Sequence, residues 1–340
     1  MSDRKFKVAV VGATGAVGET ILQILHERKF PVSELMALGS QKSAGSRVKF
    51  GDKSVVVRNL EKIDFAGVDI ALFSAGGSVS AEHAPRAAAA GAVVIDNTSH
   101  FRYMDDIPLV ISEVNPEAIA GYKTRGIIAN PNCSTMQMLV ALAPIHKIAK
   151  ITRINVSTYQ SVSGAGRSGL SELGKQTADL LSFRKFSPKK FPVQIAFNLI
   201  PQIDVFMENG YTKEEMKMVW ETHKILDASI QVNPTCVRVP VFYGHAESVQ
   251  IQTERKISAD DVRQLLRSSP GVEVFDDPAN GIFPTPVGHA AGKDAVAVGR
   301  IRDDISHPNG LNLWIVADNI RKGAALNAVQ IAELLVKSYL

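Results

Sequence analysis

Continuous apolar runs, separated by helix-like stretches, organise the first part of the chain. The run KVAVVG (7–12) ends in glycine, and GETILQILHERK (18–29) then places Ile21, Leu22 and Leu25 on one side of a helix. Further strand-like runs follow at residues 34–40, 68–76, 92–99 and 127–132. Apolar strands that alternate with helices predict an α/β fold with a parallel, doubly wound sheet.

The pattern changes near residue 150. ITRINVSTYQSVS (151–163) alternates between apolar and polar positions, and residues 235–257 form a long, partly alternating run. TKEEMKMVWETHKIL (212–226) has helical spacing. These features predict a second, α+β domain with a more antiparallel sheet. We place the domains at residues 1–132 and 133–321, and we expect an amphipathic helix at 322–340 to pack back on the first domain.

Composition supports this two-domain interpretation. The chain has 340 residues, of which 45% are hydrophobic and 21% charged, as is typical of a soluble globular protein. Its net charge of +4 is spread along the sequence apart from a cluster at FRKFSPKKF (183–191), which is better interpreted as a solvated loop than as a nucleic-acid patch. Mild basicity suits anionic ligands.

Targeting signals and disulfides are not expected. No apolar run approaches the ~20 residues of a membrane helix. The N-terminus runs directly into a strand and lacks the pattern of a secretory signal. Two cysteines give no disulfide framework, which favours the reducing cytoplasm. We expect neither a bound metal nor a membrane partner.

A glycine-rich turn joins the first strand to the first helix. VVGATGAVG (10–18) spaces Gly12, Gly15 and Gly18 three residues apart. Glycine there lets the backbone approach a pyrophosphate, and the helix N-terminus supplies N–H groups and a partial positive charge. The spacing differs from the usual GxGxxG, so a tight packing turn is the alternative. In this strand–loop–helix context we predict a Rossmann-like dinucleotide site.

The end of the second strand bears on which dinucleotide binds. An NAD site usually has an acid there to accept from the ribose 2′-hydroxyl. The sequence GSQKSAGSRV (39–48) offers none. Hydrogen-bond donors and one cation occupy this place instead, which suits a 2′-phosphate and predicts NADP over NAD. These residues are Ser40, Gln41, Lys42 and Ser43.

Cys133 is the first candidate for chemistry. It follows a strand and a Pro131–Asn132 turn, and STMQMLVALAPI then has helical spacing. A cysteine in the first turn of a helix is favoured as thiolate, although buried packing is the commoner fate of the residue type. A thiolate beside a nicotinamide suggests an acyl-thioester intermediate. Cys236 lies in the middle of a strand and is interpreted as packing.

Other polar candidates remain open on spacing alone. His245 follows a strand and a glycine, and His289 on a glycine-rich loop is its nearest rival for proton transfer. Glu214 and Lys217 share one helix face, which also fits a surface ion pair. Arg102 alone would be a solvated loop residue. SVSGAGRSG (161–169) could line the nicotinamide end or be a flexible connector.

Several motifs together resemble one family. GATGAVG, NPNCST, STYQSVSGAG and RVPVFYGHAES are similar to aspartate-semialdehyde dehydrogenases, and EVNPEAI, GRIRDD and VADNIRKGAALNAVQIAE extend the resemblance nearly end to end. It implies a dinucleotide-binding domain, a catalytic and dimerisation domain, and a homodimer or a dimer of dimers. The implied reaction interconverts 4-aspartyl phosphate and aspartate semialdehyde with NADP and phosphate, a step toward lysine, threonine and methionine.

The resemblance also implies roles for particular residues. Cys133 would be the nucleophile, His245 the acid/base and Gln160 the group that orients the acyl intermediate. The substrate carboxylate would lie on Arg238, phosphate on Arg102 and Lys217, and the substrate ammonium on Glu214. Implied cofactor contacts are Gly12, Thr14, Gly15, Ala16, Val17, Ser40, Gln41, Lys42, Ser43, Ser163, Gly164 and Asn319.

General chemistry agrees with these roles. Arg238 can grip a carboxylate through two parallel N–H bonds. Neutral His245 could take the Cys133 proton on attack and return one to the hemithioacetal oxygen. The sequence departs from the family at Gln41–Lys42, where an alanine–arginine pair is expected, so discrimination of the 2′-phosphate could be looser.

Three rival functions can be compared with the sequence. N-acetyl-γ-glutamyl-phosphate reductase shares the glycine loop and the cysteine, but its thiol usually lies in an NPGCY-like context, whereas Asn132 and Ser134 flank Cys133 here. The SCTTN-like run of glyceraldehyde-phosphate dehydrogenases is absent from the sequence. A regulator that senses NADP without turnover is the alternative that is not an enzyme, and the combination of thiol, histidine and arginines argues against it.

Overall fold

The computed structural model describes residues 4–340, and these fall into two compact units. The first contains the chain through Pro131 together with Ala324–Leu340, and the second is Asn132–Gly323. Each unit is built on a six-stranded sheet. The first sheet is parallel and the second is mixed, so the predicted fold class is confirmed.

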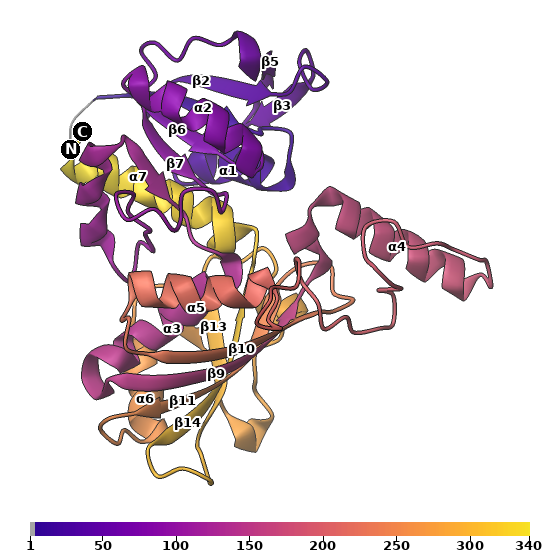
Figure 1. The fold of residues 1–340 in the computed structure, drawn as a ribbon, viewed down its shortest axis with the longest axis vertical. Helices are drawn as coiled ribbons and strands as arrows, with labels where there is room; N and C mark the ends of the chain where they lie inside the picture. The colour runs from indigo at the N-terminus through magenta and orange to yellow at the C-terminus, as the bar shows by residue number, and fades with distance from the viewer. Residues whose placement is uncertain (1–3) are drawn as a thin grey trace. The chain divides into compact units, whose positions relative to one another are not determined.

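The first sheet has the order β5-β2-β1-β6-β7-β8. Figure 1 labels four of these strands, β5, β2, β6 and β7. All its paired strands run parallel. Four of its strands, β1, β6, β7 and β8, are almost wholly buried, as expected when both faces of a parallel sheet are covered. The strands are β1 (Phe6–Val11), β2 (Val32–Gly39), β5 (Arg58–Asn59), β6 (Ile70–Phe73), β7 (Val93–Asp96) and β8 (Ile127–Ala129).

Helices cover this sheet. The apolar stripe of α1 (Ala16–Glu27) joins the core through Ile21 and Leu25, and α7 (Asn327–Ser338) packs against α1 and β7. The C-terminal segment therefore completes the core of the first unit. The remaining elements are α2 (Gly77–Ala89), the hairpin β3 (Arg47–Phe50) and β4 (Lys53–Val56), and the short helices η1 (Leu60–Lys62) and η2 (Pro116–Thr124).

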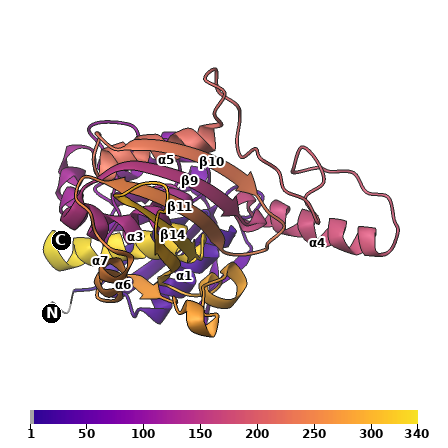
Figure 2. The same ribbon diagram turned by 90° about the horizontal axis from the view of Figure 1, so that it is seen from below.

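The second sheet has the order β10-β9-β11-β14-β13-β12, and Figure 2 shows its first four strands side by side. The β10–β9 and β12–β13 pairs are parallel and the other pairs are antiparallel. The strands are β9 (Ile151–Gln160), β10 (Gln231–Arg238), β11 (His245–Thr253), β12 (Val272–Val274), β13 (Val296–Asp303) and β14 (Gly310–Ala317).

Three helices pack against the strands of this second sheet: α3 (Cys133–Ala149), α5 (Lys213–Ile225) and α6 (Ala259–Arg267). Thr158, Gln160, His245 and Glu247 are fully or almost fully buried at alternate positions of β9 and β11. The alternate face, with Tyr159 and Trp314, is partly exposed. Short helical turns complete the unit at η3 (Val162–Ala165), η4 (Pro278–Asn280), η5 (Pro286–Ala290) and η6 (Arg321–Leu326), the last of which runs on into the first unit.

Two stretches of this unit are divided by the structure in a way that the sequence pattern left open. The run 235–257 is not one strand, because the chain leaves β10 at Arg238 and re-enters the sheet at His245 after a turn that contains Gly244 at φ +87°. The glycine-rich stretch 161–169 is not simply a loop, because α4 (Arg167–Leu181) begins within it. A Cβ on Gly169 would lie 2.4 Å from the Val162 carbonyl oxygen, so helix α4 needs glycine there to pack closely on η3.

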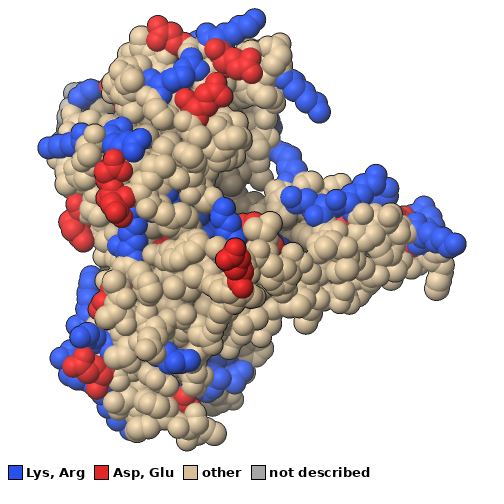
Figure 3. All heavy atoms as spheres, viewed as in Figure 1, with Lys and Arg blue, Asp and Glu red and all other residues tan. Residues whose placement is uncertain are grey.

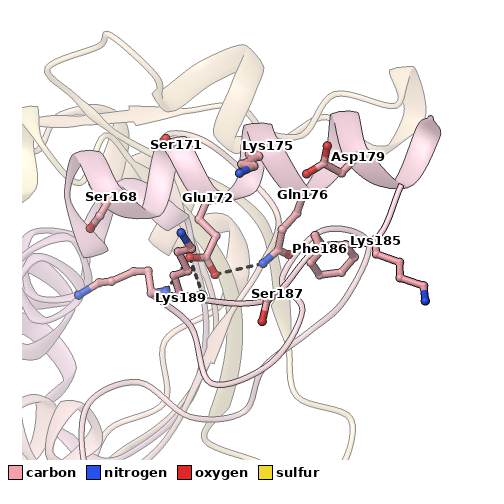
Figure 4. A pocket seen from close by; sticks show the side chains of 11 residues that line it. Ser168, Ser171, Glu172, Lys175, Gln176, Asp179, Lys185, Phe186, Ser187 and Lys189 are labelled. Carbon is pink, nitrogen blue, oxygen red and sulfur yellow. Dashed lines mark hydrogen bonds between the residues drawn. The ribbon is translucent and has the colours of Figure 1, made fainter. Parts of the chain in front are cut away.

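The basic cluster 183–191 follows α4. Figure 4 shows that Glu172 of α4 lies against this segment, and its carboxylate accepts the backbone N–H groups of Lys189 (3.0 Å) and Phe191 (3.3 Å). Gln176 donates to the same carboxylate at 3.0 Å. The groove between helix and segment encloses about 620 Å³. The lysines around it are exposed, in agreement with a solvated segment.

Charged side chains are mixed over the face in Figure 3, with a run of lysine and arginine along the α4 segment. The charge distribution thus gives no single extended basic surface on that face. Within residues 4–340, no helix has the length and apolar character needed to cross a membrane.

Candidate active site

Cys133 is the first residue of α3, as its sequence position predicted. Asn132 caps the helix, because its Oδ1 accepts the backbone N–H of Ser134 (2.9 Å) and of Thr135 (3.3 Å). The Cys133 side chain is partly exposed. A thiol at a helix N-terminus meets the positive end of the helix dipole, which favours the thiolate.

The backbone near residue 323 passes very close to this thiol. A Cβ placed on Gly323 would lie 2.7 Å from the Cys133 Cβ, closer than carbon atoms tolerate. Glycine at position 323 therefore lets the backbone pass close to the Cβ of Cys133 without covering the thiol.

Glu214 of α5 is the acidic centre of the site. Its Oε1 accepts from the Asn132 side-chain amide (2.8 Å) and from the Gln160 amide (3.3 Å), and its Oε2 accepts from Lys217 Nζ (2.9 Å). Burial alone would raise the pKa of Glu214, but the charge of Lys217 and these hydrogen bonds lower it to about 2. Glu214 is therefore an anion at neutral pH.

Lys217 lies between two carboxylates. Its Nζ is 2.9 Å from Glu214 and 2.9 Å from Asp204, which lies outside α5. Burial lowers the pKa of Lys217, yet the charge of Glu214 and the hydrogen bonds that Lys217 donates to both acids raise it above its usual range. The i, i+3 pair expected from the sequence is therefore formed in a largely buried setting and is not a surface ion pair.

Arg238 ends β10 and is buried with 6% of its surface exposed. Its Nη1 donates to the Ser161 carbonyl at 2.7 Å. Burial lowers the pKa of the guanidinium, while the charges of Glu214 and then Cys133 raise it. Arg238 thus lies within electrostatic reach of both the acidic centre and the nucleophile candidate.

His245 opens β11 and is fully buried. Its Nδ1 accepts the backbone N–H of Ser161 at 3.1 Å and lies 3.0 Å from Ser161 Oγ. Burial and then the positive charge of Arg238 lower the pKa of His245 to about 3. The imidazole is therefore neutral at physiological pH.

Gly164 borders both of these side chains. A Cβ there would lie 2.9 Å from Arg238 Nη1 and 3.4 Å from His245 Nε2. Glycine is thus needed at this position for the close approach of the turn to the guanidinium and the imidazole.

Ser163 and Asn319 are buried behind His245. Asn319 Oδ1 accepts from the Gly244 backbone N–H (3.1 Å) and from Ser161 Oγ (3.0 Å), and its amide nitrogen donates to Ser163 Oγ (3.0 Å). Both residues were expected to contact the cofactor. The geometry shows them as supports of the backbone around His245.

A groove in the first unit collects most of the other expected cofactor contacts. It encloses about 360 Å³ and is lined by residues that include Gly12, Thr14, Gly15, Ser40 and Ser43. Gly12 has φ +84°, and a Cβ on Gly18 would lie 2.1 Å from the Gly12 carbonyl oxygen, so the tight turn into α1 requires both glycines. Ala16 and Val17 begin α1, whose N-terminus can hold a phosphate group.

The polar end of β2 contributes hydroxyls to this groove. Thr14 Oγ1 and Ser40 Oγ lie 3.5 and 3.4 Å from Ser43 Oγ. Gln41 accepts from the Asn59 amide (2.6 Å), and Lys42 is exposed. One acid does line the groove, Glu61, which comes from η1 and could not be placed there from the sequence.

Arg102 is not the solvated residue that its type alone suggested. It is 6% exposed, and it donates to the Asn130 carbonyl from Nε (2.8 Å) and to the Asn97 carbonyl from Nη2 (2.8 Å). These bonds anchor it at the carboxyl ends of the strands of the first unit.

The other histidine and the other cysteine considered from the sequence, His289 and Cys236, lie in surroundings typical of structural residues. His289 sits in η5, where its Nδ1 accepts the Thr285 backbone N–H (3.1 Å) and its ring packs on Phe275. Cys236 is fully buried 3.8 Å from the Met218 sulfur, and burial raises the pKa of its thiol well above the usual value. The interpretation of Cys236 as packing is confirmed.

Three residues with a part in the site were missed. Asn132 had been interpreted only as a turn marker, although asparagine before a helix is a recognisable cap. Ser161 and Asp204 act through contacts with His245 and Lys217 that are distant in sequence, and no local pattern marks them.

Comparisons with known proteins agree with this arrangement. A family model described as "Semialdehyde dehydrogenase, NAD binding domain" matches residues 7–122. A second, described as "Semialdehyde dehydrogenase, dimerisation domain", matches residues 142–322.

Relatives match over nearly the whole length. The chain is 63% identical over 337 residues to aspartate-semialdehyde dehydrogenase 2 of Vibrio cholerae, covering 99% of each chain. It is 58% identical to an aspartate-semialdehyde dehydrogenase of a Shewanella species, again covering 99% of each. A crystal structure of aspartate semialdehyde dehydrogenase II from Vibrio cholerae, complexed with ASA, has a TM-score of 0.97 at 62% identity, covering 99% of this chain and 100% of that one.

Proposed function

This chain belongs to the aspartate-semialdehyde dehydrogenase family and is an oxidoreductase, and on that premise we propose that it reduces 4-aspartyl phosphate to aspartate semialdehyde with NADPH through a thioester on Cys133. The observation that carries the proposal is the cluster in the second unit. It combines a thiol at a helix N-terminus with Arg238, Glu214 and His245.

The cofactor would bind in the groove of the first unit. The tight glycine turn and the α1 N-terminus suit a pyrophosphate. The hydroxyls of Ser40 and Ser43 and the charge of Lys42 suit a 2′-phosphate, so we propose NADP. An aspartate semialdehyde dehydrogenase of Candida albicans, 25% identical, has been solved with NADP. Glu61 in the groove is the feature that opposes this preference. Bound NADP(H) supplies or accepts the hydride.

Cys133 would perform the covalent step. Its thiolate attacks the carbonyl carbon, a carbon–sulfur bond forms, and phosphate leaves with the electron pair of its bond to that carbon. The helix N-terminus and the nearby positive charge of Arg238 stabilise the thiolate before attack. Gln160, held by Glu214 and Thr158, would orient the acyl group.

The charged groups would fix the rest of the substrate. Aspartyl phosphate carries a carboxylate, a phosphate and an ammonium group. Arg238 provides a planar pair of donors for the carboxylate, and anionic Glu214 provides the partner for the ammonium. Lys217 and Arg102 would hold phosphate, Lys217 oriented by Asp204 and Arg102 by the Asn130 carbonyl.

We further propose that the first unit binds NADP and that two copies of the chain associate through the second. The match to a dimerisation-domain model supports this, as does the partly exposed face of the second sheet, which carries Tyr159 and Trp314. Light scattering of the purified protein should give twice the mass of one chain. A monomer at micromolar concentration would contradict this part of the proposal.

One assay tests the activity. The protein is incubated with aspartate semialdehyde, phosphate and either NADP or NAD, and NADPH or NADH absorbance is followed. We expect turnover that requires phosphate and a higher kcat/KM with NADP. Preference for the N-acetylated glutamate homologue would reassign the enzyme, and equal efficiency with both cofactors would remove the NADP argument.

Cys133→Ala separates an enzyme from a regulator. We expect the variant to lose turnover and to keep NADP binding, measured by nucleotide fluorescence. Cys236→Ala is the matched control, because that thiol is buried in packing. Turnover that survives Cys133→Ala would refute the thioester route.

A further inference from the structure

The β2 end of the groove in the first unit combines residues from two neighbouring strands. β2 and β5 run parallel, and Gly39 pairs with Asn59 at their carboxyl ends. Beyond this pair the chain continues into residues 40–43 on one side and into η1, which contains Glu61, on the other. Because parallel strands end at the same edge of a sheet, both segments border the groove.

Asn59 ties these two segments together. Its side-chain amide donates to Gln41 Oε1 at 2.6 Å, and its Oδ1 accepts the backbone N–H of Glu61 at 3.2 Å, which caps η1. Asn59 is buried, with 9% of its surface exposed. The start of η1, and with it Glu61, is therefore held beside the polar residues that follow β2.

The carboxylate of Glu61 is available to a ligand. The side chain is exposed and lines the groove. Among residues 4–340, no ion pair or side-chain hydrogen bond engages this carboxylate. Arg86 of α2 has other partners, because its Nη1 lies 2.6 Å from His83 Nδ1 and its Nη2 donates to the Ile63 carbonyl at 3.3 Å. The groove thus contains an acid whose charge no close partner neutralises.

An acid at this place discriminates between the two nicotinamide dinucleotides. NAD(H) and NADP(H) differ only at the 2′ position of the adenosine ribose, which bears a hydroxyl in the first and a phosphate in the second. A carboxylate accepts a hydrogen bond from the hydroxyl and repels the phosphate. An NAD site usually carries this acid at the end of β2 itself. Here the neighbouring strand β5 delivers an acid to the same edge through η1.

We propose that Glu61 is a specificity-determining residue, whose carboxylate accepts a hydrogen bond from the ribose 2′-hydroxyl of NAD(H) and disfavours the 2′-phosphate of NADP(H). Lys42 acts in the opposite sense. The two opposing charges let the chain bind both cofactors with a modest preference for NADP(H). This rests on the proposed function for the identity of the cofactor pair, and it adds NAD(H) as a usable cofactor.

Equilibrium binding of NADPH and NADH, measured by nicotinamide fluorescence, tests this role without turnover. The full-length native protein is compared with Glu61→Gln, which keeps the shape of the side chain and removes its charge. We expect the variant to bind NADPH up to about fivefold more tightly and NADH roughly tenfold more weakly. The ratio of the Kd of NADH to that of NADPH should therefore rise at least about fivefold. A smaller rise, or none, would overturn the proposal.

Two further variants serve as controls. Glu117→Gln changes an exposed glutamate of the same unit, in η2 beside β8, at the opposite edge of the sheet from β5. It should leave both dissociation constants unchanged. Lys42→Ala should weaken NADPH binding up to about fivefold and leave NADH binding unchanged. If Lys42→Ala lowers the ratio while Glu61→Gln does not raise it, the segment after β2 alone discriminates the 2′ position and Glu61 does not.

Ionic strength separates charge from shape. Repulsion between exposed charges is screened by salt, so the tighter NADPH binding of Glu61→Gln should shrink as salt rises from about 20 mM to about 300 mM. A gain that does not change with salt would show that the substitution acts through the shape of the loop, against the proposal.

The binding constants also keep this proposal separate from the proposed activity. A protein that shows the expected change in the ratio but does not turn over aspartate semialdehyde would refute the activity and leave the role of Glu61 standing. A protein that turns over aspartate semialdehyde, with an unchanged ratio in Glu61→Gln, would refute the role of Glu61 and leave the activity standing.

Discussion

Glu247 is a buried carboxyl group that the proposed reaction does not use. It lies two residues after His245 on β11 and is fully buried. Within residues 4–340, no well-formed hydrogen bond reaches either of its carboxyl oxygens. The side chain of Gln137 lies near enough to offset part of the rise in pKa that burial causes. Burial raises the pKa of Glu247 well above its ordinary value of 4.5. Burial therefore favours the protonated form of this carboxyl in the folded chain.

The sign of the pH effect follows from linkage. Below pH 4.5 the group is protonated in both folded and unfolded chains, so it contributes no pH dependence. Above that pH the unfolded chain releases the proton and the folded chain keeps it. The free energy of unfolding then falls by about 1.4 kcal/mol for each pH unit, until the folded group also titrates.

Glu247→Gln removes this loss while keeping the shape of the side chain. The free energy of unfolding is measured by urea unfolding at pH 5.5, 6.5 and 7.5, monitored by tryptophan fluorescence. Both tryptophans, Trp220 in α5 and Trp314 in β14, report on the second unit. The free energy of unfolding of the variant should rise relative to that of the native protein as pH increases, by at most about 1.4 kcal/mol per pH unit, and only while Glu247 stays protonated in the folded chain.

The control is Glu208→Gln, which changes an exposed glutamate. It should follow the native profile. If the profiles of native protein and Glu247→Gln run parallel from pH 5.5 to 7.5, then Glu247 is ionised in the folded chain and the argument from burial is wrong.

Three more outcomes follow from the site. Gly164→Ala would put a carbon 2.9 Å from Arg238 Nη1. The guanidinium should therefore shift and kcat/KM should fall roughly 10- to 100-fold; an unchanged value would show that the exact position of Arg238 does not matter for turnover. Asp204→Asn loosens Lys217 and should raise KM for phosphate up to about fivefold while kcat stays unchanged. Steady-state kinetics measure both constants, and a change in kcat alone would contradict this prediction. Because the pKa of Glu214 is about 2 against an ordinary 4.5, its ionised form stabilises the fold by about 3 kcal/mol above pH 4.5, and this is lost as pH falls toward 2. The urea midpoint of Glu214→Gln should therefore drop less between pH 5 and 3 than that of the native protein, and equal drops would contradict the pairing.

The parts of the fold that could be predicted are those with local signals. Strands buried on both faces give continuous apolar runs in the sequence. The spacing of Gly12 and Gly18 indicates the glycine turn before α1. Helix α4 was missed because Gly169 and Gly174 lower helix propensity. At Gly169 the reason is tertiary, since close packing on η3 excludes a side chain.

The chemistry of the site was predictable only in part. The position of Cys133 depends on a strand, a turn and a helix that adjoin in sequence, so a local pattern reveals it. The orientation of His245 depends on a backbone N–H at Ser161, 84 residues away. The buried state of Lys217 depends on Asp204, 13 residues away and outside the helix. Such partners exist only once the sheet has formed.

Asn132 connects the nucleophile candidate with the charged groups. Its side-chain oxygen caps α3, which fixes the first turn that carries Cys133, and its side-chain nitrogen donates to Glu214 at 2.8 Å. Its backbone N–H donates to Glu221, also in α5, at 2.6 Å. An Asp at this position would cap the helix equally well but would set a second anion against Glu214. The amide is therefore needed for its two opposite polar ends, which let one residue orient the thiol and share the charge of the acid that we propose to bind substrate.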